Sequence, residues 1–190
     1  MSSAHPSPTR LRTRQAIVEA AISVWVRDRD ATLGDIAAQA QTHRTTLHRH
    51  FESRVDLLDA AVRRCIADIS AATESTSVDQ GPPLDALRRV VGAYLAIGDR
   101  IRFLFEDLTL ARSPVVAEFA AADGPVMELI RRCQAEGTLD PWLPPAWIET
   151  TIWALVYAAS EAIDNSILPA HEALGFLLAT IERGITGAGE

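Results

Sequence analysis

An all-α protein with two domains is predicted by three features of the sequence. Apolar residues recur at spacings of three and four over most of its 190 residues, as on the buried faces of helices. Segments containing proline and glycine, at residues 74–83 and 137–145, separate these stretches. Hydrophobic and charged contents of 48% and 23% are ordinary for a globular chain. We expect about nine helices, in a three-helix domain at residues 10–70 and a second helical domain at residues 71–190.

The first helix is expected at residues 13–27, after a polar and basic segment that we expect to be flexible as far as residue 9. Its inward positions are Ile17, Ala20, Ala21, Val24 and Trp25. A short helix follows from Thr32, because Thr32 and Asp35 have the spacing of a capping box. Its apolar face consists of Leu33, Ile36, Ala37 and Ala40.

A second short helix is expected from Arg44 to Phe51, after a break at residues 41–43, with Leu47 and Phe51 inward. Its outward positions carry cationic, hydroxyl and imidazole groups, on Arg44, Thr45, Thr46, His48, Arg49 and His50. Two short helices joined by a three-residue turn, with donors on the second, are typical of a helix-turn-helix. Such a helix fits a major groove about 12 Å wide. Residues 32–51 therefore predict binding to double-stranded DNA.

The distribution of charge supports this prediction. The net charge is −7, yet residues 1–64 contain ten arginines and seven acidic residues, a balance of +3. The remainder is strongly acidic, which suits a protein that approaches phosphates with one end only. Arg10, Arg12 and Arg14 either reach phosphates or a minor groove beside the second short helix, or form a solvated basic tail.

Six further helices are expected along the chain. They cover residues 55–73, 84–97, 101–111, 115–136, 145–164 and 169–185. Pro125 removes a backbone donor within the fourth of these, so we expect a kink or two helices there. The last two helices carry more apolar surface than the core of one protomer needs.

Residues 10–65 resemble the DNA-binding domain of TetR-family transcriptional regulators. The resemblance is carried by R-x-x-I-x-x-A-A from Arg14, T-L-x-D-I-A-x-x-A from Thr32, and T-T-L-H-R-H-F-x-S-R-x-D-L-L from Thr45. It implies a repressor that a small molecule releases from a palindromic operator. It also implies a homodimer formed by the last two helices. The DNA-binding residues are then Thr32, His43, Arg44, Thr45, Thr46, His48, Arg49, His50 and Arg54, with Arg54 at a position where the family contacts phosphate.

Three positions depart from the family pattern. Gln41 replaces a glycine in the turn, Thr42 replaces a small aliphatic residue, and His48 replaces a tyrosine that commonly contacts a phosphate. If position 41 needs a positive φ, glutamine costs about 1 kcal/mol relative to glycine. These departures affect the expected operator sequence and affinity more than the fold.

An effector pocket is implied among the helices of the second domain. Its candidate residues are Tyr94, Phe103, Phe105, Glu106, Met127, Trp153 and Tyr157. An acidic group in an apolar cavity favours a cationic or donor-bearing compound. Glu106 and Asp107 have an alternative, because they can face solvent or pair with Arg100, Arg102 or Arg112 on the same helix. Taken singly, each of these candidates is better explained as a core residue than as a ligand contact.

Several other classes of protein are not favoured by the sequence. No apolar run is long enough to span a membrane, and no secretory signal is present, so we expect a cytoplasmic protein. Cys65 and Cys133 have no metal-type spacing and are expected to be buried reduced thiols. We expect no metal site, no cofactor and no catalytic residue. The alternative function is an all-α enzyme or small-molecule-binding protein with an incidental helix-turn-helix pattern.

Overall fold

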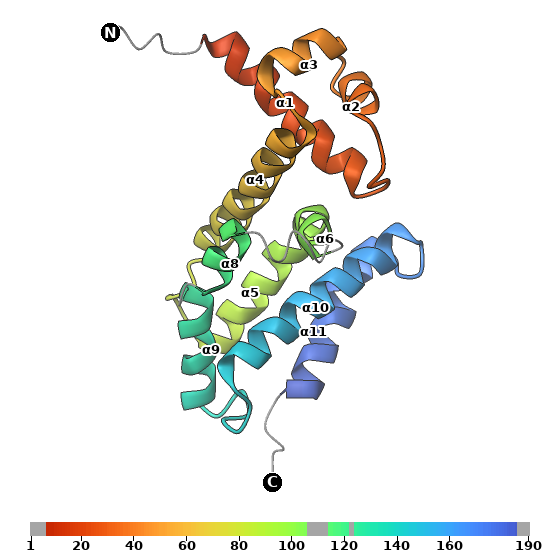
Figure 1. The fold of residues 1–190 in the computed structure, drawn as a ribbon. Helices are drawn as coiled ribbons and strands as arrows, with labels where there is room; N and C mark the ends of the chain where they lie inside the picture. Colours follow the sequence, from red (N-terminus) through yellow and green to blue (C-terminus); the bar gives the residue numbers. More distant parts are fainter. Residues whose placement is uncertain (1–6, 106–113, 122–123, 186–190) are drawn as a thin grey trace, which may run out of the picture. The chain divides into compact units, whose positions relative to one another are not determined.

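The computed structural model describes residues 7–105, 114–121 and 124–185. Within these ranges all regular structure is helical, in ten helices, and no strand occurs. The chain divides into two compact units, residues 1–65 and 66–190. Figure 1 traces the helices along the chain, with α4 (Arg54–Ser75) continuing from the first unit into the second.

The first unit consists of three helices and the beginning of α4. These three are α1 (Pro8–Trp25), α2 (Leu33–Gln39) and α3 (Arg44–His50), and both α1 and α2 pack against α3. Its core is formed by side chains that are at most 1% exposed, among them Ile17, Trp25, Ile36, Leu47 and Leu57. The inward faces expected for these helices are confirmed except at Val24, Leu33 and Ala40, which are half-buried.

The expected start of the first helix is wrong by five residues. Helix α1 begins at Pro8, and the Ser7 side chain caps it by accepting a hydrogen bond from the Arg10 N–H at 3.3 Å. Proline suits the first helical position, because its missing N–H has no partner there in any helix. Arg10, Arg12 and Arg14 are consequently helical residues and not part of a flexible arm.

The turn between α2 and α3 contains a residue with positive φ. Gln41 has φ +49°, its N–H donates to the Ala38 carbonyl at 3.0 Å, and the Thr42 N–H donates to the Ala37 carbonyl at 2.9 Å. This pair of hydrogen bonds is the Schellman ending of a helix, in which glycine is the favoured residue. The strained position suspected from the sequence at Gln41 is thus confirmed.

The second unit is built around helix α10. Its helices beyond α4 are α5 (Pro83–Ala96), α6 (Gly98–Phe105), α8 (Pro114–Ala121), α9 (Pro125–Ala135), α10 (Pro145–Asp164) and α11 (Ala170–Ile185). Helix α10 packs against α5, α6, α9 and α11. The expected interruption at Pro125 is confirmed, since α9 begins with that proline. No helix in the described part of the chain is long and apolar enough to cross a membrane.

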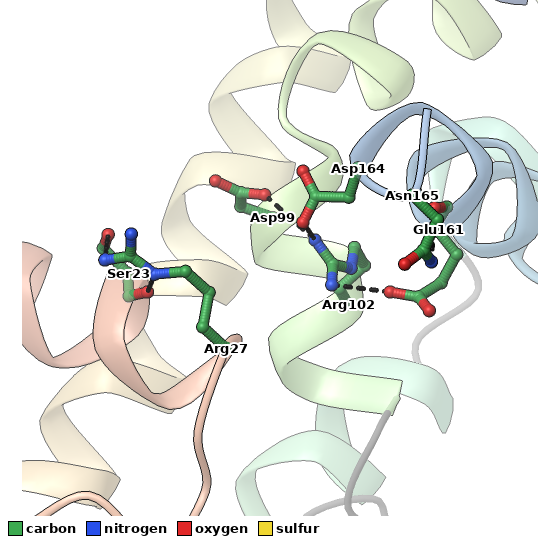
Figure 2. A network of polar contacts seen from close by, with 7 residues as sticks. All are labelled: Ser23, Arg27, Asp99, Arg102, Glu161, Asp164 and Asn165. Atoms are coloured by element: carbon green, nitrogen blue, oxygen red, sulfur yellow. Dashed lines mark hydrogen bonds and ion pairs between the residues drawn. The ribbon is translucent and has the colours of Figure 1, made fainter. Parts of the chain in front are cut away.

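Helices α6 and α10 meet at a close contact and an ion-pair network. A Cβ atom on Gly98 would lie 2.1 Å from the Ser160 Oγ, so only glycine fits there. One turn later the guanidinium of Arg102, whose side chain is 7% exposed, pairs with Glu161 at 2.5 Å and with Asp164. Figure 2 shows Arg102 reaching both carboxylates from α6, with Asp99 3.7 Å away. This packing fixes α6 against the C-terminal half of α10.

Candidate nucleic-acid interface

Helix α3 presents a polar face because its apolar residues anchor it to the first unit. Leu47 is 0% exposed and Phe51, the residue that ends the helix, is 3% exposed. The expected contact residues lie on the remaining surface. Arg44, Thr45, His48 and Arg49 are exposed, and Thr46 and His50 are half-buried. The arrangement offers guanidinium, hydroxyl and imidazole groups on one short helix, without a carboxylate.

The starts of α2 and α3 hold two further candidates. His43 precedes α3, and its carbonyl accepts the N–H groups of Thr46 and Leu47, which leaves its exposed imidazole outside the cap. At the start of α2 the N–H and hydroxyl of Thr32 both donate to the Asp35 carboxylate at 2.7 Å. The expected capping box is confirmed, and these hydrogen bonds lower the pKa of Asp35. Both donors of Thr32 are therefore directed at Asp35, on the surface of the first unit.

A group of positive charges surrounds the end of α3. The Arg14 guanidinium lies over the Phe51 ring, with its carbon 4.7 Å from the ring centroid. His50, in the last turn of α3, is half-buried. Burial, followed by the positive charges of Arg10, Arg49 and Arg14, lowers the pKa of the His50 imidazole. Residues from α1 and α3 thus form one cationic surface.

Arg54 occupies a different environment from the one expected. Its guanidinium donates to the backbone carbonyl of Ala31 at 2.5 Å and to that of Arg29, and it lies 4.7 Å from the centroid of the Trp25 ring. These contacts join the start of α4 to the loop that precedes α2. A guanidinium has five donors, so two hydrogen bonds do not exhaust it. Its geometry is nevertheless that of a residue that holds the helix-turn-helix together.

The second unit contains a stack of aromatic side chains. Tyr94 and Trp153 lie with ring centroids 4.4 Å apart and planes at 18°, and Phe105 lies 6.2 Å from Trp153 at 27°. Tyr94 is buried, Trp153 is half-buried and Phe105 is 44% exposed, so the stack runs from the core to the surface. Burial raises the pKa of Tyr94 to about 12, and the negative charge of Glu149 adds to this effect.

The other expected pocket residues have varied positions. Phe103 is 0% exposed and is a core residue, whereas Met127 and Tyr157 are half-buried on α9 and α10. Glu106 and Asp107 lie outside the described residues. Glu149 was missed in the sequence, although it precedes Trp153 by one helical turn, a spacing that places both on one face of α10.

Both cysteines are buried free thiols, as expected, and burial is the main cause that raises the pKa of Cys133. Among the described residues no three histidine, cysteine or acidic side chains gather closely enough to hold a metal ion.

Comparisons with known proteins agree with this geometry. Residues 17–61 match the family described as bacterial regulatory proteins, tetR family. The HTH-type transcriptional repressor LfrR of Mycolicibacterium smegmatis is 36% identical over 181 residues, which cover 94% of this chain and 93% of LfrR. The crystal structure of LfrR from Mycobacterium smegmatis in complex with proflavine has a TM-score of 0.76 and 33% identity, covering 94% of this chain and 99% of that chain. The structure of the ketosteroid transcriptional regulator KstR2 of Mycobacterium tuberculosis has a TM-score of 0.72 and 19% identity, covering 92% of this chain and 95% of that chain. At this identity the similarity supports the fold alone.

Proposed function

Because the chain belongs to the TetR family of bacterial regulatory proteins, we propose that it is a homodimeric repressor that a planar aromatic cation releases from its operator. Its membership makes it a DNA-binding transcriptional regulator. The homodimer, the residues that contact DNA and the effector are the parts that we propose here. We assign DNA binding to residues 10–70, and effector binding and dimerisation to residues 71–190. It would act in the cytoplasm, on DNA.

DNA binding is assigned to α3. The observation that carries this assignment is the exposed donor face of α3, held outward by the buried side chains of Leu47 and Phe51. In a dimer, two such helices enter successive major grooves of a near-palindromic site. Arginine reads guanine with two hydrogen bonds, and hydroxyl and imidazole groups contact bases or phosphates. The proposed contacts are Thr32, His43, Arg44, Thr45, Thr46, His48, Arg49, His50 and Arg54.

A mobility-shift titration with the DNA upstream of the protein's own gene tests this assignment. Arg44→Ala is expected to weaken binding by 10- to 100-fold, because a bidentate arginine–base pair contributes about 1–3 kcal/mol. Arg63→Ala is the matched control, since Arg63 is an exposed arginine of α4 that pairs with Asp59. Equal binding by the wild type and Arg44→Ala would exclude α3 as the reader.

Dimerisation is assigned to α10 and α11. Large apolar side chains remain exposed on these helices, including Trp147 at 59%, Phe176 at 49% and Leu174 at 36%. Exposed apolar residues gathered on two neighbouring helices are typical of an interface between subunits. Phe176→Glu is expected to convert the dimer into a monomer in sedimentation analysis. Leu11→Glu, which changes a side chain 46% exposed on α1, should leave the dimer intact.

The effector is assigned to the aromatic stack. Trp153 and Phe105 are accessible aromatic rings, the buried Tyr94 supports the stack from below, and Glu149 is close enough to Tyr94 to raise its pKa. Ring faces and a nearby carboxylate both favour a cation, and flat rings favour a flat ligand. LfrR, at 33% identity, has been crystallised with proflavine, which is such a compound. This chemistry supports a ligand of the same class here.

Proflavine itself is the probe for this assignment. Trp153→Ala is expected to weaken its binding about 10- to 30-fold, which corresponds to the roughly 2 kcal/mol of a desolvated cation–π contact. Glu149→Gln should weaken it less, and Trp142→Ala, which changes a side chain 83% exposed, should not weaken it. Fluorescence anisotropy measures these affinities. Unchanged binding in Trp153→Ala would exclude the stack as the site.

A further inference from the structure

The first turns of α1 place two arginines on one side of the helix. Arg10 and Arg14 are four residues apart, so they project from the same face, whereas Arg12 projects from nearly the opposite face. All three side chains are exposed. This placement follows from the start of α1 at Pro8, which makes the basic segment rigid.

The face of Arg10 and Arg14 is directed at the end of α3. The Arg14 guanidinium is stacked 4.7 Å from the centroid of Phe51, the residue that ends α3. Stacking limits the motion of a guanidinium but leaves its in-plane donors available to an anion. His50 belongs to the preceding turn, and Arg10 lies near enough for its charge to act on that imidazole.

No carboxylate belongs to either helical segment of this surface. Residues 8–18 of α1 and residues 44–50 of α3 contain no aspartate or glutamate. Cationic groups brought together in this way repel one another, so the arrangement costs free energy unless an anion lies between them.

The contacts of Arg54 show that this arginine is partly engaged within the protein. Arg54 stands at the start of α4, yet its guanidinium is bound to the carbonyl groups of Ala31 and Arg29 and lies over Trp25. Arg54 is exposed and keeps donors for a phosphate, but part of its hydrogen-bonding capacity is used within the protein. Outward-facing arginines of α1 would add positive charge for the DNA backbone.

We propose that Arg10 and Arg14 of α1, together with Arg49 and His50 of α3, form a site for one phosphate group of the operator backbone. This site deepens the proposed function and rests on it, because the phosphate belongs to the DNA that α3 reads. The three arginines neutralise the phosphate, His50 contacts it through its imidazole, and together they fix how α3 enters the groove. They add affinity without reading sequence, since phosphate contacts carry no base information. Arg10 is exposed and, unlike Arg14, does not stack on Phe51, and so it is the best one to test.

The test is the salt dependence of DNA binding by the full-length protein. Fluorescence anisotropy is recorded between 50 and 300 mM salt with the duplex upstream of its own gene and with a random duplex of equal length. Each phosphate contact contributes about 0.9 to the slope of log K against log salt concentration. Arg10→Gln is therefore expected to lower the slope by about 1 on both duplexes. Arg14→Gln should do the same, with thermal unfolding recorded alongside because Arg14 also packs on Phe51.

Arg12→Gln is the matched control, because it removes the same charge from the other face of the same helix. Its slope should equal that of the wild type. Equal slopes for Arg10→Gln and the wild type would overturn the proposal, as would equal losses in Arg10→Gln and Arg12→Gln. A loss confined to the specific duplex would also overturn it, since it would mean that Arg10 reads bases. If the wild type binds neither duplex at any salt concentration, the proposed function itself fails.

Discussion

The hydroxyl oxygens of Thr73 and Tyr94 lie 2.8 Å apart in the core of the second unit and join α4 to α5. The Thr73 hydroxyl donates its hydrogen to the Ile69 carbonyl at 3.0 Å, so Tyr94 is the donor to Thr73. The ring of the same tyrosine stacks on Trp153 at 4.4 Å. Tyr94 therefore links the proposed effector site directly to α4, the helix that continues into the first unit.

Tyr94→Phe is expected to separate effector binding from effector response. Phenylalanine keeps the stack on Trp153 but loses the hydrogen bond to Thr73, which costs about 0.5–1.5 kcal/mol of stability. Proflavine affinity should change less than threefold, whereas the weakening of operator binding by saturating proflavine should fall several-fold. Thr73→Ala, which removes the same hydrogen bond from the other side, should behave alike. An unchanged response in both variants would exclude this hydrogen bond from the coupling.

Gly98→Ala is expected to destabilise the second unit by about 1–3 kcal/mol, as overpacking of a close contact does. The added Cβ would lie 2.1 Å from the Ser160 Oγ and 2.9 Å from the Ser160 Cβ. Gly92→Ala is the control, because its Cβ would meet Leu174 at an ordinary 3.5 Å and alanine favours the helix by up to about 1 kcal/mol. Urea unfolding of both variants should give opposite signs. A stabilising Gly98→Ala would show that α6 and α10 move apart easily.

Local features of the fold were predictable from the sequence, whereas contacts between distant segments were not. The helix-turn-helix was predictable because its signals are local: the spacing of Ile36, Ala37 and Leu47, and the capping box of Thr32 and Asp35. The start of α1 was predictable too, since Ser7 and Pro8 are a cap and a first-turn residue, but the basic segment was taken for an arm. The start of α6 was not predictable, because Gly98 is required there by its close contact with Ser160. The two residues are 62 positions apart, and only the folded chain brings them together.

The same distinction applies to the functional residues. The outward face of α3 follows from helical periodicity, which needs no tertiary information. The environment of Arg54 depends on carbonyl groups in a loop more than 20 residues away, and no local pattern predicts it. The aromatic stack combines α5, α6 and α10, so composition suggested its members without showing which of them meet.

Gln41→Gly is expected to stabilise the first unit by about 1 kcal/mol. The left-handed conformation at φ +49° is strained for glutamine, whereas glycine adopts it without strain. For a unit of this size the gain corresponds to a rise in Tm of about 4–8 °C. Gln39→Gly, a replacement within α2, should have the opposite sign and a similar size. Thermal unfolding followed by circular dichroism measures both, and a loss of stability in Gln41→Gly would contradict the strain at this turn.

The pKa of His50 is expected to report the charges around it. Burial and then the charge of Arg10 lower this pKa from its ordinary 6.5, so the unfolded chain takes up the proton first and the folded protein loses stability as the pH falls below 6.5. Arg10→Gln should raise the pKa, though not to 6.5, because burial persists, and Arg12→Gln should leave it unchanged. NMR titration of the imidazole signal, assigned through His50→Gln, measures it.

A DNA phosphate beside His50 would favour the charged imidazole, so binding of the operator should raise the pKa of His50. For the same reason the affinity for the operator should increase as the pH falls, and this increase should be larger in the wild type than in His50→Gln. Identical titrations in Arg10→Gln and Arg12→Gln would mean that Arg10 does not lie beside this histidine, and the phosphate site would lose its geometric basis.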